Sequence, residues 1–144
     1  MSPTYTYPRP ALTADAVVFC ATDKTILLIQ RKNEPFKDQW ALPGGFVESY
    51  EEPFQACLRE LAEETQLDLK ENNENLIGVF GKKGRDPRGW TVSVAYFFMV
   101  DQHKKSLVQS GSDSKNVQWI PLDQVQKLAF DHNEMIALAV RNFL

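Results

Sequence analysis

The chain has 144 residues and a formal net charge of −3, and 43% of its residues are hydrophobic and 24% charged. This is the length and composition of about one ordinary globular domain, so we expect a single domain spanning residues 1–144. The negative charge offers no general attraction to nucleic acid or to an anionic membrane, and the absence of a membrane-spanning apolar run and of a signal-peptide pattern predicts a cytoplasmic protein.

Two strand patterns open the chain. β-branched and aliphatic runs at 13–22 and 25–31 are separated by Asp23-Lys24, which predicts a hairpin. A polar loop at 33–39 leads to a short apolar segment at 40–45. Because this segment ends in two glycines, which free the backbone, we expect it to lead into a loop.

A helix is predicted from Pro53 to about Thr65. Proline suits the first helical position, Glu52 is a weak cap, and Gln55 can return a hydrogen bond to the cap. At about 100° per residue, an apolar arc adjoins an arc of three glutamates. The predicted apolar arc consists of Phe54, Cys57, Leu58, Leu61, Ala62 and Thr65.

Further strands are predicted after the helix, at 76–80 and 90–100. The segment between them, 81–89, is rich in glycine and arginine and is too charged to be core. We therefore expect it to be an exposed connection.

The last part of the chain contains a polar stretch at 101–116, a strand at 117–120 and a final helix, for which Asp131 and Glu134 form a predicted capping box. Strands on both sides of one helix, followed by a second helix, imply a mixed sheet that is covered on both faces. The predicted fold class is therefore α/β, with an α/β/α sandwich.

Three carboxylates, Glu60, Glu63 and Glu64, lie within about one turn of the predicted helix. Like charges at this spacing repel one another, and crowding raises carboxyl pKa values unless a cation compensates. A solvated acidic face would do no chemistry, whereas a metal site would suit Mg²⁺ or Mn²⁺, which prefer hard oxygen ligands. The flanking residues favour the metal site.

Those flanking residues resemble the signature of the Nudix hydrolase family, which has conserved spacing of Gly, Glu, Arg-Glu, Glu-Glu and Gly around two aliphatic positions. The resemblance covers nearly the whole chain and implies an α/β/α Nudix sandwich that hydrolyses nucleoside diphosphates linked to another moiety. The chain supplies Gly45, Glu51, Arg59-Glu60, Leu61, Glu63-Glu64 and Leu67, with Gln66 where the signature has its second glycine.

The resemblance also implies roles for these residues. Glu60 and Glu64 are the expected metal ligands, and Glu63 is a third ligand or holds metal-bound water. The main-chain carbonyl of Gly44 is a further expected ligand. A divalent metal would neutralise phosphate charge and acidify the attacking water.

Supporting roles are expected for the other signature residues. Arg59 is counted with the glutamates as a catalytic residue, and it is expected to form a salt bridge with Glu51 that braces the loop against the helix. Gly45 is expected to have a structural role in the backbone. Gln66 would incur a penalty of about 1 kcal/mol in the left-handed conformation typical of glycine there, unless the helix ends differently. The general base is left open between Asp113 and Glu63.

The substrate is indicated by residues outside the signature. Arg85-Asp86-Pro87-Arg88-Gly89 resembles a segment of ADP-ribose pyrophosphatases, and the arginine forks of Arg85 and Arg88 suit phosphate and ribose oxygens. A charged turn is the alternative. His132 is a candidate contact to ribose or phosphate, or else a capping or surface residue. Phe36 is a candidate for stacking on adenine, or else packs in the fold.

The predicted function is a Mg²⁺-dependent (or Mn²⁺-dependent) pyrophosphatase that cleaves ADP-ribose to AMP and ribose 5-phosphate. One alternative is a nucleoside triphosphate pyrophosphatase. Another is a module that senses ADP-ribose without cleaving it, as in regulators with an added DNA-binding domain, for which this chain leaves no room. A homodimer is expected because it is common among similar proteins.

Overall fold

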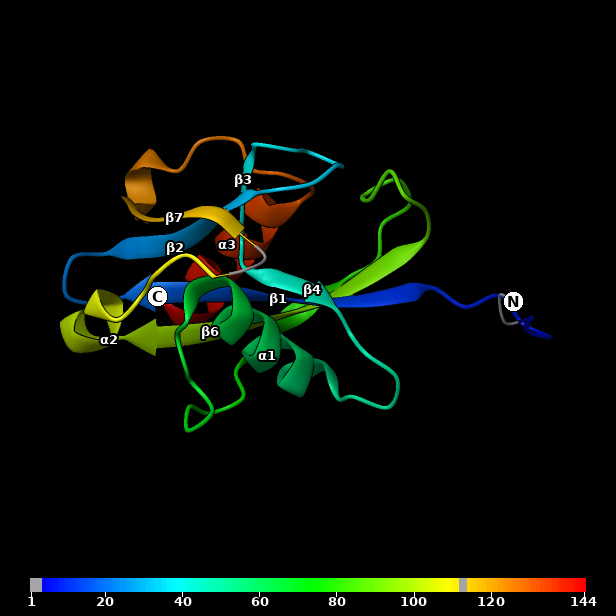
Figure 1. The fold of residues 1–144 in the computed structure, drawn as a ribbon, viewed down its shortest axis with the longest axis horizontal. Coiled ribbons are helices and arrows are strands. Elements are labelled where there is room, and N and C mark those ends of the chain that lie inside the picture. The colour runs from blue at the N-terminus through cyan, green and yellow to red at the C-terminus, as the bar shows by residue number, and fades with distance from the viewer. Residues whose placement is uncertain (1–3, 112–113) are drawn as a thin grey trace.

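Seven strands form one mixed sheet in the computed structural model, which describes residues 4–111 and 114–144 (Figure 1). The strand order is β3-β2-β1-β6-β5, with β4 also paired to β1 and β7 to β2. The β1–β6 pair is parallel and the other pairs are antiparallel. The strands are β1 (Ala11–Cys20), β2 (Thr25–Arg31), β3 (Trp40–Ala41), β4 (Gly44–Phe46), β5 (Leu76–Phe80), β6 (Thr91–Val100) and β7 (Ser114–Pro121).

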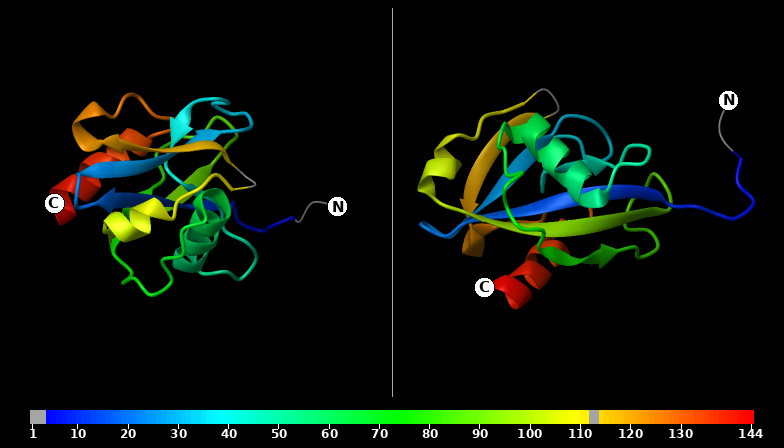
Figure 2. Two further views of the ribbon diagram at one scale, coloured as in Figure 1. Left: turned by 60° about the vertical axis from the view of Figure 1, so that its left-hand side comes forward. Right: turned by 90° about the horizontal axis from the view of Figure 1, so that it is seen from below.

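The two longer helices cover opposite faces of the sheet (Figure 2). They are α1 (Pro53–Thr65) and α3 (His132–Phe143), and two short helices, α2 (Gln102–Ser106) and the 3₁₀ helix η1 (Leu122–Gln124), lie in the connections. Within the described part of the chain, no helix has both the length and the apolarity that crossing a membrane requires.

Strand β1 builds two hydrophobic cores because its side chains alternate between the faces of the sheet. Ala16 and Val18 belong to the cluster that contains the buried residues of α1, whereas Val17 and Phe19 belong to the cluster that contains those of α3. The predicted α/β/α sandwich is confirmed.

The sheet opens along one edge of β1. Strand β2 pairs with β1 only at its end, at Phe19 and Cys20, whereas β4 takes over this edge at residues 13–15. Between these two stretches the Ala16 N–H donates to the Pro43 carbonyl at 2.8 Å. Because β2 and β4 diverge from here, the residues of β1, β2 and β4 can line a cavity.

Several local predictions were wrong. The stretch 101–116 contains α2 and the start of β7, and the predicted segment 40–45 divides into two short strands. Ala62 is exposed rather than part of the packed arc of α1. The Asp131 side chain makes no capping bond to α3, because its carboxylate is paired with Arg85 instead.

Helix α1 ends with Gln66 in the left-handed conformation, at φ 62° and ψ 17°. The helix therefore ends as it would with the signature glycine, and glutamine accepts the strain. Its side-chain Nε2 donates to the Ser110 carbonyl at 3.0 Å. Nearby, the N–H groups of Gln109 and Gly111 donate to the carbonyls of Thr65 and Glu64, each at 2.9 Å. The chain before β7 thus satisfies helix-end carbonyls that lack partners within α1.

The strain at Gln66 can be measured with two variants that both remove the side-chain amide. Gln66→Gly is expected to have a free energy of unfolding about 1 kcal/mol higher than Gln66→Ala, because only glycine adopts positive φ without a Cβ penalty. Urea denaturation measures both. Equal stability would mean that the left-handed backbone at this position carries no strain.

Candidate active site

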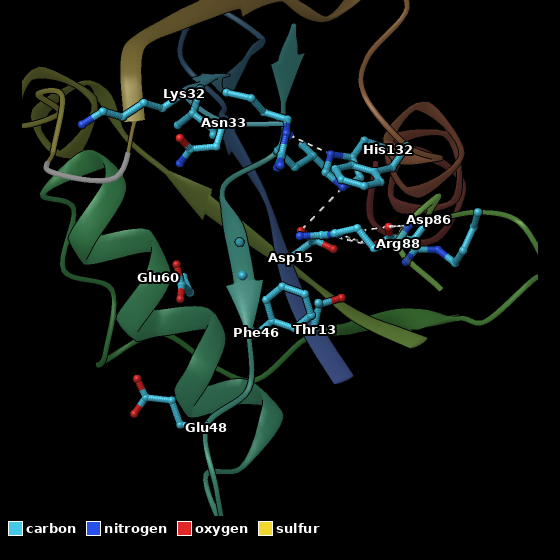
Figure 3. A pocket seen from close by; sticks show the side chains of 17 residues that line it. Thr13, Asp15, Lys32, Asn33, Phe46, Glu48, Glu60, Asp86, Arg88 and His132 are labelled. Atoms are coloured by element: carbon cyan, nitrogen blue, oxygen red, sulfur yellow. Dashed lines mark hydrogen bonds and ion pairs between the residues drawn. The ribbon is translucent and has the colours of Figure 1, made fainter. Parts of the chain in front are cut away.

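A cavity of about 630 Å³ lies where β2 and β4 diverge from β1. Its wall includes Glu60 of α1, three arginines, and residues from the β5–β6 connection and the start of α3. The volume lies in the range typical of small-molecule sites. The cavity therefore gathers segments that are far apart in the sequence (Figure 3).

The carboxylates of Glu60 and Glu64 lie against the backbone of β4. The Gly44 N–H donates to Glu64 Oε1 at 2.7 Å, and Glu64 is only 5% exposed. A Cβ built on Gly45 would lie 2.4 Å from Glu60 Cδ, so a side chain at this position would displace the carboxylate. The N–H of Gly44 and the missing side chain of Gly45 thus allow the two acidic side chains to reach the same short stretch of main chain.

Glu63 differs from its two neighbours on α1. Its side chain is 40% exposed and lies 3.4 Å from Arg59 Nη1. Glu60 lines the cavity, whereas neither Glu63 nor Glu64 is among the described lining residues. Of the three expected catalytic glutamates, Glu60 and Glu64 both lie against β4, and Glu63 lies on the more exposed surface beside Arg59.

The pair of carboxylates fits Mg²⁺ or Mn²⁺. Among residues 4–111 and 114–144 no three His, Cys, Asp or Glu side chains converge as a ready-made metal cage. Magnesium, however, is usually held by one or two carboxylates and completes its shell with water and substrate phosphate. The hard oxygens of Glu64, bound to the Gly44 N–H, and of Glu60, in the space beside Gly45, meet this requirement.

Arg59 ties the loop after β4 to helix α1. Its Nε and Nη2 donate to the Glu51 carboxylate at 2.9 and 3.0 Å, Nη2 also donates to the Phe46 carbonyl at 3.0 Å, and Nη1 donates to Glu60 at 2.8 Å. The hydrogen bonds between Arg59 and Glu51 lower the pKa of the Glu51 carboxyl and raise the pKa of the Arg59 guanidinium. The expected salt bridge between Arg59 and Glu51 is confirmed.

Replacing Arg59 with lysine tests this brace. A point-like ammonium cannot reproduce the planar fork that contacts a carboxylate, a carbonyl and a second carboxylate at once, so Arg59→Lys is expected to lower the free energy of unfolding by about 1–3 kcal/mol. Chemical denaturation measures the change. The matched control, Arg141→Lys at an exposed position of α3, is expected to change it by less than about 0.5 kcal/mol.

The two arginines predicted to bind substrate both line the cavity, and each is paired with an aspartate. Arg85 donates through Nε and Nη2 to both oxygens of Asp131, at 2.8 and 2.6 Å. Arg88 donates through Nε and Nη2 to Asp86, and its guanidinium lies 4.8 Å from the centre of the Phe46 ring. Burial acts against the charge of Arg85, but the pairing with Asp131 raises its pKa. Both arginines are thus held in place by an aspartate.

Asp86 lies in the connection between β5 and β6, where its carboxylate accepts hydrogen bonds from Arg88. Burial acts to raise its pKa, but hydrogen bonds from the side chain and N–H of Arg88 outweigh burial and lower the pKa below its ordinary value. Since the folded pKa is lower than the unfolded one, the interaction stabilises the protein above about pH 4 and is lost as the pH falls through the folded pKa.

The variant Asp86→Asn removes this titration. From about pH 4 downward, the free energy of unfolding of the unmodified protein is expected to fall more steeply with decreasing pH than that of Asp86→Asn. Urea denaturation between pH 7 and pH 3 measures both curves. Parallel curves over the acid range would show that the Asp86 carboxylate is not linked to folding.

Phe36 does not line the cavity, and its ring packs edge-on against Phe130 with centroids 4.8 Å apart. Phe130 and Phe46 line the cavity instead, and the sequence analysis missed both. The position of Phe46 directly after the signature glycine was a usable signal. Phe130 gave no such signal, since only the tertiary fold brings it to the cavity.

His132 is buried, with 4% of its surface exposed, and it lines the cavity. The Leu42 N–H donates to its Nδ1 at 3.0 Å, and Nε2 lies 3.6 Å from Asp15 Oδ1 (Figure 3). Burial lowers the pKa of His132. The alternative of a surface or capping histidine was therefore wrong. Asp15 was not predicted as a site residue, although a carboxylate within an apolar strand was a usable signal. Asp113, a candidate general base, lies outside the described residues.

The match to known proteins covers most of the chain. The family model described as NUDIX domain matches residues 10–139. The chain belongs to the Nudix family. Members of the family generally use divalent metal ions, which agrees with the carboxylate pair beside β4.

Three similar proteins show which members of the Nudix family resemble this chain. An ADP-ribose pyrophosphatase of Methanocaldococcus jannaschii is 41% identical over 90% of this chain and 73% of its own length. The ADPR responsive transcriptional repressor NtrR of Acinetobacter baylyi is 39% identical over 92% of this chain, which spans only 54% of the repressor. The NUDIX domain of Shewanella oneidensis NrtR, solved with ADP ribose, has a TM-score of 0.84 at 34% identity and matches over 96% of this chain and 91% of that one.

Proposed function

We propose that this Nudix protein is a divalent-metal-dependent pyrophosphatase that hydrolyses ADP-ribose to AMP and ribose 5-phosphate. The supporting observation is a single cavity whose wall contains Glu60, beside the buried carboxylate of Glu64, together with the guanidinium groups of Arg31, Arg85 and Arg88. Metal-binding carboxylates and phosphate-binding arginines facing one cavity suit a diphosphate ligand.

In this proposal Glu60 and Glu64 hold Mg²⁺ or Mn²⁺, assisted by the Gly44 carbonyl and by Glu63 at the edge. The metal would neutralise phosphate charge and acidify the attacking water. The protein orients the ligands: the Gly44 N–H fixes one oxygen of Glu64, and Arg59 Nη1 fixes one oxygen of Glu60. Glu63 and Asp113 remain the two candidates for the general base.

Arginines of the cavity would bind the rest of the diphosphate. Arg85 is locked by Asp131, so it would act mainly by its charge and position, whereas Arg88 is partly exposed beside Phe46 and can reach a ligand. The 41% identity to an ADP-ribose pyrophosphatase supports ADP-ribose over a nucleoside triphosphate. A nucleobase would find the exposed ring of Phe46 and the ring of Phe130 in the same cavity.

A second candidate is binding of ADP-ribose without hydrolysis, because a regulator that responds to ADPR is 39% identical to this chain. The presence of Glu60 in the cavity wall, with Glu64 held beside it on the Gly44 N–H, favours hydrolysis. We further propose that the chain is one domain, acts in the cytoplasm as a homodimer, and binds neither nucleic acid nor membrane.

The proposal is tested by incubating the protein with ADP-ribose and Mg²⁺ and identifying the products by chromatography. AMP and ribose 5-phosphate are expected, with no turnover in EDTA. Glu64→Gln is expected to lower kcat/KM by a factor of about 100 or more, since loss of metal charge removes several kcal/mol of transition-state stabilisation.

The matched control is Glu134→Gln, a charge-neutralising change in the first turn of α3, which should keep full activity. Binding of ADP-ribose without product would favour the sensing function. Rapid hydrolysis of nucleoside triphosphates with no release of AMP from ADP-ribose would refute the substrate assignment. Full metal-dependent turnover by Glu64→Gln would refute the ligand assignment.

A further inference from the structure

Asp15 and His132 face each other across the inner end of the cavity (Figure 3). Both are nearly buried, with 6% and 4% of their surfaces exposed. Asp15 lies on β1 and His132 begins α3, so neither the metal-binding helix nor its signature includes them. The gap of 3.6 Å between Asp15 Oδ1 and His132 Nε2 is longer than a hydrogen bond.

The surrounding hydrogen bonds decide which atoms face this gap. The Leu42 N–H donates to His132 Nδ1, so that nitrogen carries no proton and the proton of the neutral ring lies on Nε2. Ser93 Oγ donates to Asp15 Oδ2, which leaves Oδ1 directed to His132. The gap is therefore bounded by one acceptor, Asp15 Oδ1, and one donor, His132 Nε2–H.

No atom fits between two atoms 3.6 Å apart, but a ligand group on the cavity side of the pair can contact both. Such a group must donate to Asp15 Oδ1 and accept from His132 Nε2–H. A phosphate oxygen would accept from His132 but would be repelled by the Asp15 carboxylate, and a carbonyl has no proton to donate. A hydroxyl has both capacities. The positive charges of Arg31 and Arg85 act on both residues and compensate the buried carboxylate of Asp15.

The position of Asp15 and His132 relative to the carboxylates of α1 indicates which part of a ligand can reach them. Strand β4 passes between Glu60 and Asp15 (Figure 3). Gly45 lies against Glu60, and Gly44 lies against Asp15 Oδ1. A diphosphate held on the Glu60 side would therefore extend its next group past β4 toward Asp15. In a nucleoside diphosphate sugar, that group carries several hydroxyls.

We propose that Asp15 and His132 form a hydroxyl-binding subsite, in which one sugar hydroxyl of a diphosphate-linked ligand donates to Asp15 Oδ1 and accepts from His132 Nε2–H. This inference rests on the proposed function only for the ligand class and does not require hydrolysis. The hydroxyl can belong to the terminal ribose or to the ribose of adenosine.

The test is calorimetric binding of ADP-ribose and of ADP, which lacks the terminal ribose, with Ca²⁺ in place of Mg²⁺. Asp15→Asn is expected to weaken ADP-ribose binding about 10- to 100-fold, because its amide group would place a donor where the hydroxyl needs an acceptor. His132→Asn keeps an oxygen for the Leu42 N–H but removes the Nε2 donor, and is expected to weaken binding about 3- to 10-fold.

Two comparisons identify the hydroxyl. Weakening of ADP-ribose binding alone assigns it to the terminal ribose, and equal weakening of ADP binding assigns it to the ribose of adenosine. Asp23→Asn, in the β1–β2 turn outside the cavity, is the matched control and should leave both affinities within about twofold. His132→Gln, which restores a donor near the Nε2 position, should recover part of the affinity lost in His132→Asn.

Thermal unfolding of each variant shows whether it is folded, and His132→Asn decides the question if Asp15→Asn does not fold. Unchanged affinity for both ligands in a folded Asp15→Asn or His132→Asn would overturn the subsite, as would a lack of binding of either ligand to the unmodified protein. Binding without AMP release would refute the proposed hydrolysis but leave the subsite standing. Hydrolysis of ADP-ribose by the unmodified protein, together with unchanged affinities in the folded variants, would support the proposed hydrolysis and refute the subsite.

Discussion

The close approach of helix α1 to the main chain of β4 is the constraint on which the site depends. The Gly44 N–H binds Glu64, and the missing side chain at Gly45 leaves space for the carboxylate of Glu60. Arg59 then connects Glu60 to the loop that follows β4. Because the main chain of β4 binds Glu64 and Glu60 lies where Gly45 lacks a side chain, the same contacts position the helix, the strand and the two carboxylates.

The cavity exists because strand β1 shares one edge between two partners. Strand β4 pairs with residues 13–15 of that edge and β2 only with its end, so the two partners diverge and the nearly buried Asp15 lines the cavity between them. The cavity then has Glu60 of α1 in its wall together with Asp15, His132 and the arginines. Two chemical environments, separated by one short strand, suit a ligand in which a diphosphate joins a sugar.

The parts of the site that could be predicted are those that depend on spacing within one segment. Glu60 and Glu64 are four residues apart on a helix that Pro53 begins. The contact of Arg59 with Glu51 was implied by the resemblance to the Nudix signature. Asp131 shows the limit of this reasoning: its spacing to Glu134 indicated a helix cap, but Arg85, 46 residues away, offered it a charged partner. A bidentate ion pair outcompetes a single hydrogen bond to a helix end.

The sequence by itself determined the sandwich and the helix that carries the three glutamates, because hydrophobic periodicity and helical spacing are local properties. The resemblance to the Nudix signature supplied the bracing role of Arg59. Only the tertiary structure decided that Asp15 and His132 face each other, that Phe130 rather than Phe36 lines the cavity, and that Glu63 lies outside it. The physical reason is that each of these outcomes depends on where β1, α3 and the β5–β6 connection meet, and the packing of two cores on opposite faces of one sheet sets that meeting point.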